Sequence, residues 1–264
     1  MTKTNAWRLR LSAFLVCAIA VVPAAAVVTH SLPPLTARQV KAIIATAHPG
    51  TRPNLSARDL SGLDLTAVAF HGARLDRANM FEAILIGADL SQAQMDGANL
   101  SSVKMDRARA SGALLRGATF LTTAADANFE RADLSRSSGY LIAPGAVMRH
   151  AIIRRAKLAP DLSNQPMGML HTILARANLE GADLSFSDLS FADLNYADFR
   201  KALVRGTNFH GADLSAADFT GADVTGANFA QADLTDAVFA RVRGRSAMRG
   251  LGTARNLDTA IFRR

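Results

Sequence analysis

The sequence has a single cysteine, Cys17, among its 264 residues. A disulfide framework needs pairs of cysteines and a cysteine-ligated zinc site needs several, so both are excluded. Aromatic residues make up only 6% of the chain, although 49% of it is hydrophobic. Alanine, leucine and aspartate therefore carry the pattern, as is typical of a repetitive fold with small, regular packing positions.

The chain also lacks the usual marks of an enzyme. Its histidines after residue 26 are His30, His48, His71, His150, His171 and His210. None has the spacing of a metal-ligand pair, and there is no nucleophile elbow or phosphate-binding glycine loop. We therefore expect no catalytic residue, no cofactor and no metal site. The alternative is an envelope enzyme with its site in the central loops.

Residues 1–26 predict a secretory signal peptide. A basic start precedes an uncharged apolar run at residues 11–22, and alanines at 24–26 offer a cleavage site before Val27. The alternative is a retained membrane anchor through residues 9–28, because this stretch is long enough to span a bilayer. We expect export to the periplasm or the extracellular space. The anchor alternative would hold the protein at the inner membrane, with its folded part outside the cytoplasm.

Residues 27–54 predict a linker and an N-terminal capping helix. Thr36 can cap a helix over residues 36–48, and Val40, Ile43, Ile44 and Ala47 would share one face. Such a short helix cannot form a domain, so its apolar stripe must pack on a neighbouring structure.

From residue 55 an apolar residue, the centre, recurs every five positions, first over residues 55–120 and again over residues 174–239. In the second run alanine lies two positions before the centre in 11 of 14 units, and Asp or Asn one position before it in 11 of 14. Five is neither the helical period nor the strand period. Each unit must therefore join a short extended stretch to a turn, which Asp and Asn favour.

Two of these units are Ala177-Asn178-Leu179-Glu180-Gly181 and Ala182-Asp183-Leu184-Ser185-Phe186. They resemble the pentapeptide-repeat family, whose consensus is A-(D/N)-L-x-x. The resemblance extends over residues 55–240. It implies an all-β fold, a right-handed parallel β-helix of quadrilateral cross-section with four pentads to each coil.

A coil of four pentads places residues twenty apart on one face. Phe199, Phe219 and Phe239 should then stack inside the coils, and Phe209 and Phe229 should stack on the opposite face. The middle, residues 121–173, is irregular, and we expect loops at residues 135–145 and 159–168. We expect one continuous stack; the alternative is two β-helices joined by a linker.

Residues 241–264 form an arginine-rich C-terminal tail, which we expect to cap the stack, since an open end exposes apolar core. This end is also a candidate surface for a homodimer. Residues 171–239, in contrast, carry four basic and ten acidic residues. Their aspartates should form ladders, one of Asp193, Asp213 and Asp233 and another of Asp198 and Asp218.

The resemblance implies one use for such ladders. Pentapeptide proteins that protect DNA gyrase from quinolones imitate nucleic acid with an anionic surface. The simpler explanation is that Asp is the usual turn residue and faces water. A secretory signal also argues against a cytoplasmic topoisomerase as the partner.

A basic patch in the irregular middle is the candidate binding site. Arg149, Arg154, Arg155 and Lys157 should all point outward, where they could bind phosphate, lipid head groups or an acidic glycan. The simpler explanation is a solvated face. We therefore predict an exported, non-enzymatic scaffold that binds a protein or envelope surface, with nucleic acid not expected as a partner. The alternative is a cytoplasmic, DNA-mimicking regulator of a type II topoisomerase.

Overall fold

The computed structural model describes residues 33–48, 51–160 and 170–263. All of them belong to one compact unit, Leu32–Arg264. The predicted signal peptide or anchor lies outside the described residues. Within the described ranges, no helix is long and apolar enough to cross a membrane.

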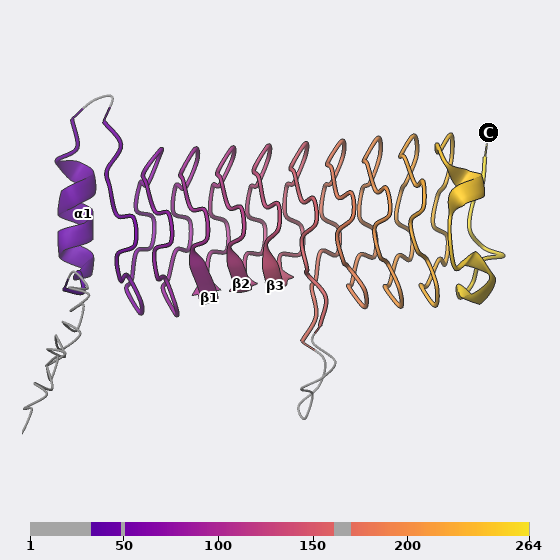
Figure 1. The fold of residues 1–264 in the computed structure, drawn as a ribbon, viewed down its shortest axis with the longest axis horizontal. Coiled ribbons are helices and arrows are strands. Elements are labelled where there is room, and N and C mark those ends of the chain that lie inside the picture. The colour runs from indigo at the N-terminus through magenta and orange to yellow at the C-terminus, as the bar shows by residue number, and fades with distance from the viewer. Residues whose placement is uncertain (1–32, 49–50, 161–169, 264) are drawn as a thin grey trace, which may run out of the picture. The chain divides into compact units, whose positions relative to one another are not determined.

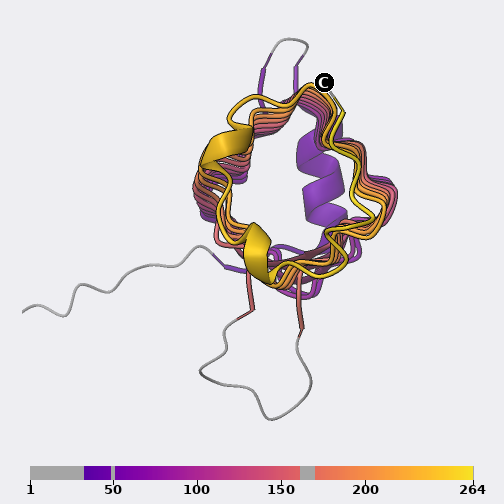
Figure 2. The same ribbon diagram turned by 90° about the vertical axis from the view of Figure 1, so that its right-hand side faces the viewer.

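The described chain winds into a stack of coils, a parallel β-helix (Figure 1). Parallel backbone bridges join each coil to the next at four positions, so four ladders run along the stack. We name them ladders A, B, C and D after their members in one coil, Asp183, Asp188, Asp193 and Asp198. A view along the stack superimposes the coils (Figure 2). The turns between two ladders therefore also stack, and we call each such stack a turn column, for example column AB.

One pentad shows why the period is five. The buried centre Leu179 accepts a hydrogen bond at 3.0 Å from the backbone N–H of Ala182, which closes a turn. Gly181, the third residue of that turn, has a φ of 67°, as a type II turn requires. Asn178 Oδ1 accepts from the N–H of Glu180 at 3.1 Å and fixes the start of the turn. Alternation of one such turn with one bridge gives the five-residue unit.

Phenylalanine rings fill the C-terminal coils as the twenty-residue spacing predicts. The ring of Phe219 lies 4.6 Å from that of Phe199 and 4.9 Å from that of Phe239, with interplanar angles of 1° and 3°. Phe209 and Phe229 stack at 5.4 Å, and Phe219 meets Phe229 edge to face at 5.9 Å. All five rings are buried. The predicted stacks are confirmed, and edge-to-face contacts join them.

The coil length changes only in column BC of the irregular middle. Strands β1 (Asn99–Lys104), β2 (Thr119–Thr123) and β3 (Ser138–Ile142) form a parallel sheet in that order. Asn99 pairs with Thr119, 20 residues later, whereas Lys104 pairs with Thr123, only 19 later. The coil that ends with β3 is also one residue short, because every residue of β2 pairs with one 19 positions later in β3. The next coil is longer, because Ile142 pairs with Ile173. The ladders continue throughout, so the prediction of one continuous stack is confirmed.

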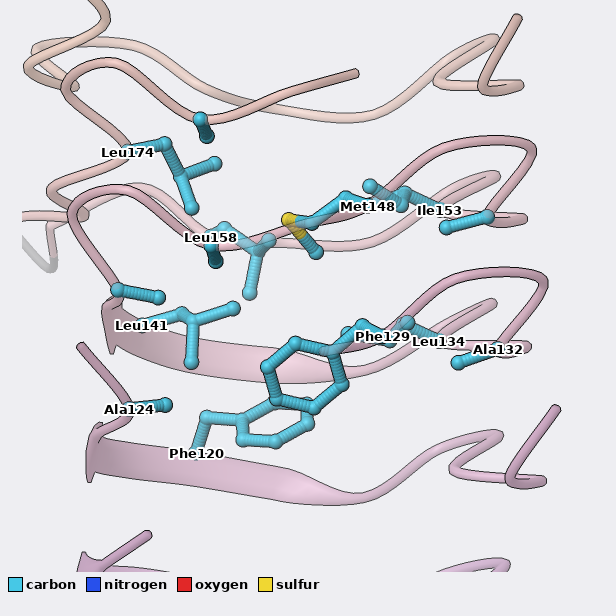
Figure 3. Packing of buried hydrophobic residues seen from close by; sticks show 14 of the residues in the cluster. Phe120, Ala124, Phe129, Ala132, Leu134, Leu141, Met148, Ile153, Leu158 and Leu174 are labelled. Atoms are coloured by element: carbon cyan, nitrogen blue, oxygen red, sulfur yellow. The ribbon is translucent and has the colours of Figure 1, made fainter. Parts of the chain in front are cut away.

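The loop that we predicted at residues 135–145 is wrong, because β3 lies inside it. Gly139 suggested a loop, but it pairs with Phe120 at a position where a Cβ would lie 1.7 Å from the Phe120 carbonyl oxygen. Leu141 enters the core, near Phe120 and Phe129 (Figure 3). The second predicted loop, residues 159–168, falls almost entirely outside the described residues.

Helix α1 (Ala37–Ala45) packs at the N-terminal end of the stack (Figure 1). Thr36 caps it as predicted, in a capping box with Gln39. The helix ends at Ala45 rather than at residue 48, and Thr46 Oγ1 donates to a carbonyl of the last turn at 2.8 Å. Val40 is fully buried, while Ile43 and its neighbour Ile44 pack partly against the core.

At the other end the coils lengthen and include two 3₁₀ helices, η1 (Arg245–Ala247) and η2 (Leu251–Thr253). Val238 still pairs with Ile261, so the pattern returns after the tail begins. Phe262 stacks on Phe239 at 5.0 Å, and the guanidinium of Arg245 lies 4.4 Å from the Phe262 ring centre. Phe262 therefore extends the phenylalanine stack by one ring, and the cation of Arg245 lies over that ring.

Candidate anion-binding groove

A groove of about 430 Å³ opens on column AB, lined by Arg116, Ser135, Arg136, Arg154 and Arg155. These residues come from the same turn in three successive coils. Backbone hydrogen bonds fix their order: the N–H of Arg136 donates to the carbonyl of Arg154 at 2.9 Å. The stacking of coils thus brings together side chains that are far apart in the sequence.

Two of the four arginines are held by carboxylates. Arg116 Nε donates to both carboxylate oxygens of Asp96, at 3.1 and 3.0 Å, and this hydrogen bonding raises the pKa of Arg116. Arg154 Nε lies 3.5 Å from a carboxylate oxygen of Asp183, in the next coil. These pairs fix the two guanidinium groups at the groove.

The other two arginines, Arg136 and Arg155, form no ion pair with any residue in the described ranges. Both are exposed, and both occupy the positive-φ position of their turns, with φ of 59° and 55°. They therefore occupy equivalent places in adjacent coils. Each guanidinium offers five N–H donors.

The structure brings together only part of the predicted basic patch. Arg154 and Arg155 line the groove, whereas Arg149 lies in column DA, on the other side of ladder A. Lys157 is an exposed member of ladder B, where it pairs with Asp188. Sequence reasoning missed Arg116 and Arg136. The sequence shows the repeat shifting back by one residue at Phe129 and Leu134, but this shift was not carried through to the pairing of Arg116 and Arg136 with Arg154.

The acidic ladders exist as predicted. Asp193, Asp213 and Asp233 are consecutive members of ladder C, and Asp198 and Asp218 of ladder D. Each carboxylate accepts a hydrogen bond from the backbone N–H two residues later; for Asp213 the distance is 2.9 Å and for Asp218 it is 2.8 Å. These carboxylates stabilise turns.

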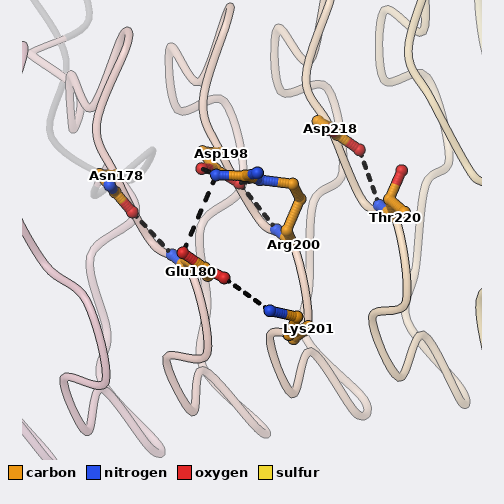
Figure 4. A network of polar contacts seen from close by, with 7 residues as sticks. All are labelled: Asn178, Glu180, Asp198, Arg200, Lys201, Asp218 and Thr220. Atoms are coloured by element: carbon orange, nitrogen blue, oxygen red, sulfur yellow. Dashed lines mark hydrogen bonds and ion pairs between the residues drawn. The ribbon is translucent and has the colours of Figure 1, made fainter.

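Ladder D also carries an ion-pair network, which Figure 4 shows. Arg200 binds Asp198 at 2.6 Å and lies 3.8 Å from Glu180, which accepts from Lys201 at 2.9 Å. Burial opposes ionisation of Asp198, but the hydrogen bonds from Arg200 outweigh it and lower the pKa of Asp198. The hydrogen bond from Lys201 similarly lowers the pKa of Glu180. The network neutralises part of the acidic surface.

Metal chemistry finds no support in the part of the chain that the structure describes. No three His, Cys, Asp or Glu side chains gather there in a group that could hold a metal ion. The aspartate ladders instead direct one carboxylate oxygen to their own turns. Cation coordination needs several oxygens converging from different directions.

Comparison with known proteins agrees with the fold. The family model described as pentapeptide repeats matches residues 83–120, 172–211 and 212–243, with eight copies. HetL, a pentapeptide repeat protein involved in heterocyst differentiation regulation in the cyanobacterium Nostoc sp. strain PCC 7120, aligns with a TM-score of 0.51 and 28% identity. That alignment covers 84% of this chain and 92% of HetL.

Two further solved structures are similar at lower scores. QnrB1, a plasmid-mediated fluoroquinolone resistance protein, is 22% identical with a TM-score of 0.34, over 73% of this chain and 89% of QnrB1. A pentapeptide repeat protein of the Arabidopsis thaliana thylakoid lumen is 20% identical with a TM-score of 0.23, over 73% and 79% of the two chains. No curated protein matches the sequence.

Proposed function

We propose that this chain, which is a pentapeptide-repeat protein, is an exported, non-enzymatic scaffold that binds a protein or an envelope surface through its outer turns. One observation carries the proposal: arginines from three coils converge on an external groove, whereas apolar side chains fill the interior. A filled interior leaves binding to the outside of the coils. The groove supplies the charge that recognition of an acidic surface requires.

The proposal includes the finer features of the architecture. The four ladders are the sides of a right-handed, quadrilateral coil that occupies residues 55–240. Residues 27–54 contain helix α1, which caps its N-terminal end, and residues 241–264 cap the other. The burial of Val40 in α1 supports the first cap, and the stacking of Phe262 on Phe239 supports the second.

The alternative, a DNA-mimicking topoisomerase regulator, needs carboxylates that are free to imitate phosphates. The aspartates of ladders C and D are instead engaged in their own turns, and some, such as Asp198 and Asp233, also pair with arginine. These contacts favour the scaffold. For a central-loop enzyme, the described ranges offer no group of three His, Cys, Asp or Glu side chains that could hold a catalytic metal ion.

Cell fractionation followed by crosslinking of the native protein tests the proposal. We expect the protein in the envelope or outside the cell, crosslinked to a defined partner, with an intact mass that begins near Val27. A full-length chain recovered from membranes would support the anchor instead of cleavage. A full-length soluble chain in the cytoplasm would contradict export and favour the topoisomerase alternative.

A further inference from the structure

We infer that the groove on column AB is a binding site for a phosphomonoester group. This inference rests on the proposed binding role of the outer turns and names the ligand chemistry of one of them. The two guanidinium groups without an ion pair in the described ranges, those of Arg136 and Arg155, bind the ligand. Arg116 and Arg154, held by carboxylates, form the walls.

The spacing of the two arginines suits one small anion. Arg136 and Arg155 occupy the same turn position in adjacent coils, and neighbouring strands lie about 4.8 Å apart. Because both side chains line the same groove, an anion bound between them is stabilised by both cations. The nearby carboxylate of Asp133 does not serve this role, because it accepts from the N–H of Ser135 at 2.9 Å and from its hydroxyl group.

The number of donors favours a phosphoryl group over a carboxylate. A carboxylate has two oxygens, and one guanidinium can bind both in a bidentate pair, as Nε and Nη2 of Arg116 do with Asp96. A phosphomonoester presents three terminal oxygens, which share up to two negative charges, and can accept from both Arg136 and Arg155 at once. Ser135 also lines the groove, but its hydroxyl group already donates to Asp133, so the two arginines supply the donors.

The next coil adds an apolar neighbour. Phe186 occupies the turn position that follows Arg155 along column AB, and 58% of it is exposed. Its ring lies over Gly206, where a Cβ would come within 2.9 Å of it. A phosphomonoester can come from a lipid head group or from a soluble ester. Phe186 distinguishes these sources, because only a lipid brings an acyl layer against the ring.

The experiment combines calorimetric titration of the native protein with inorganic phosphate and flotation with vesicles of phosphatidic acid in phosphatidylcholine. Pure phosphatidylcholine vesicles are the blank. The test variant is Arg136→Gln with Arg155→Gln. The matched control is Arg107→Gln with Arg131→Gln, which removes two charges from positive-φ turn positions in other columns. All four side chains are exposed. Thermal unfolding of both double variants is the check that they fold.

We expect the groove variant to bind phosphate and phosphatidic acid vesicles at least about tenfold more weakly than wild type, because each lost charged hydrogen bond is worth that much. The control variant should match wild type.

Three outcomes would overturn the site: equal weakening in both variants, undiminished binding by the groove variant, or a wild-type protein that binds neither probe. If Phe186→Ala weakens flotation but not phosphate titration, the source is a lipid. Phosphate binding without flotation indicates a soluble ester. A protein that crosslinks to an envelope partner but binds neither probe would refute only the groove assignment.

Discussion

Asn228 Nδ2 donates a hydrogen bond to Asn208 Oδ1 at 2.9 Å, one coil earlier in ladder B. Asn208 in turn donates to Asp188 Oδ1, also at 2.9 Å. A second run, from Asn99 to Asp59, repeats the arrangement in the N-terminal coils. Each run ends on a carboxylate, which only accepts hydrogen bonds. The side chains of ladder B thus link coils in addition to the backbone.

Replacing Asn208 should weaken this linkage. Asn208→Ala removes the acceptor of Asn228, the donor to Asp188 and the acceptor of the His210 N–H. We expect a loss of about 1–3 kcal/mol in the free energy of unfolding, measured with urea. Gln231→Ala, at an exposed turn position, is the control. Equal stabilities of the two variants would show that the ladder is not stabilising.

The phenylalanine stack gives a larger expected effect. Phe219→Ala leaves a cavity between Phe199 and Phe239 and should lower the free energy of unfolding by about 3–5 kcal/mol. Phe219→Asp should be worse, because it places an unpaired charge in the core. Chemical denaturation measures both. If either variant unfolds within error of wild type, the assignment of this ring to the core is wrong.

Gly139 should not tolerate a side chain. Its φ is 107°, and a Cβ would overlap the Phe120 carbonyl oxygen. Gly139→Ala should cost about 3 kcal/mol, since β2 and β3 must separate or shift. Gly117→Ala, also at positive φ but with no atom within 4 Å of the added Cβ, should cost less, about 1–2 kcal/mol. Thermal unfolding of the pair checks the order, and the reverse order would contradict the pairing of Gly139 with Phe120.

Acid should lower the free energy of unfolding by protonating the ladder aspartates, and replacement of Asp223 tests this. Asp223 is a buried residue, and burial opposes ionisation of its carboxyl group, but hydrogen bonds from Thr225 and Arg205 outweigh burial and lower the pKa of Asp223 below 3.8. A lowered folded-state pKa gives stability that is present above the unfolded value, near 4, and is lost as pH falls through the folded value. The free energy of unfolding of Asp223→Asn, measured with urea, should therefore depend less on pH below about 4 than that of the wild type. An unchanged pH profile would contradict this role.

The repeat was predictable from the sequence wherever the five-residue spacing is unbroken, at residues 55–120 and 174–239. The spacing of Phe199, Phe219 and Phe239 sufficed for their stacking, because a coil of four five-residue units returns each centre to the same face. The start of α1 at Ala37 was equally predictable from its capping residue, Thr36. Both depend on local patterns, so neither required knowledge of how the coils pair elsewhere.

The groove could not be predicted, because its residues depend on pairing in the irregular middle. Gly139 and Pro144 suggested a loop, yet Gly139 pairs within the sheet and Pro144 begins a turn. With that segment assigned to a loop, Arg116 and Arg136 had no predicted neighbour in the next coil. The bridges from Leu114 to Asp133 and from Asp133 to Ile152 show that each of these coils loses one residue while column AB stays aligned.

Column BC also has a consequence for how such a chain can acquire new segments. Successive passages from ladder B to ladder C run from Thr119 to Thr123, from Ser138 to Ile142 and from Lys157 to Ile173. The other three passages of these coils stay five residues long. Length changes are therefore absorbed locally and are not transmitted to the neighbouring faces. Column BC is therefore a suitable insertion site for a foreign peptide. Insertions and deletions during evolution could also accumulate there without disturbing the remaining repeats.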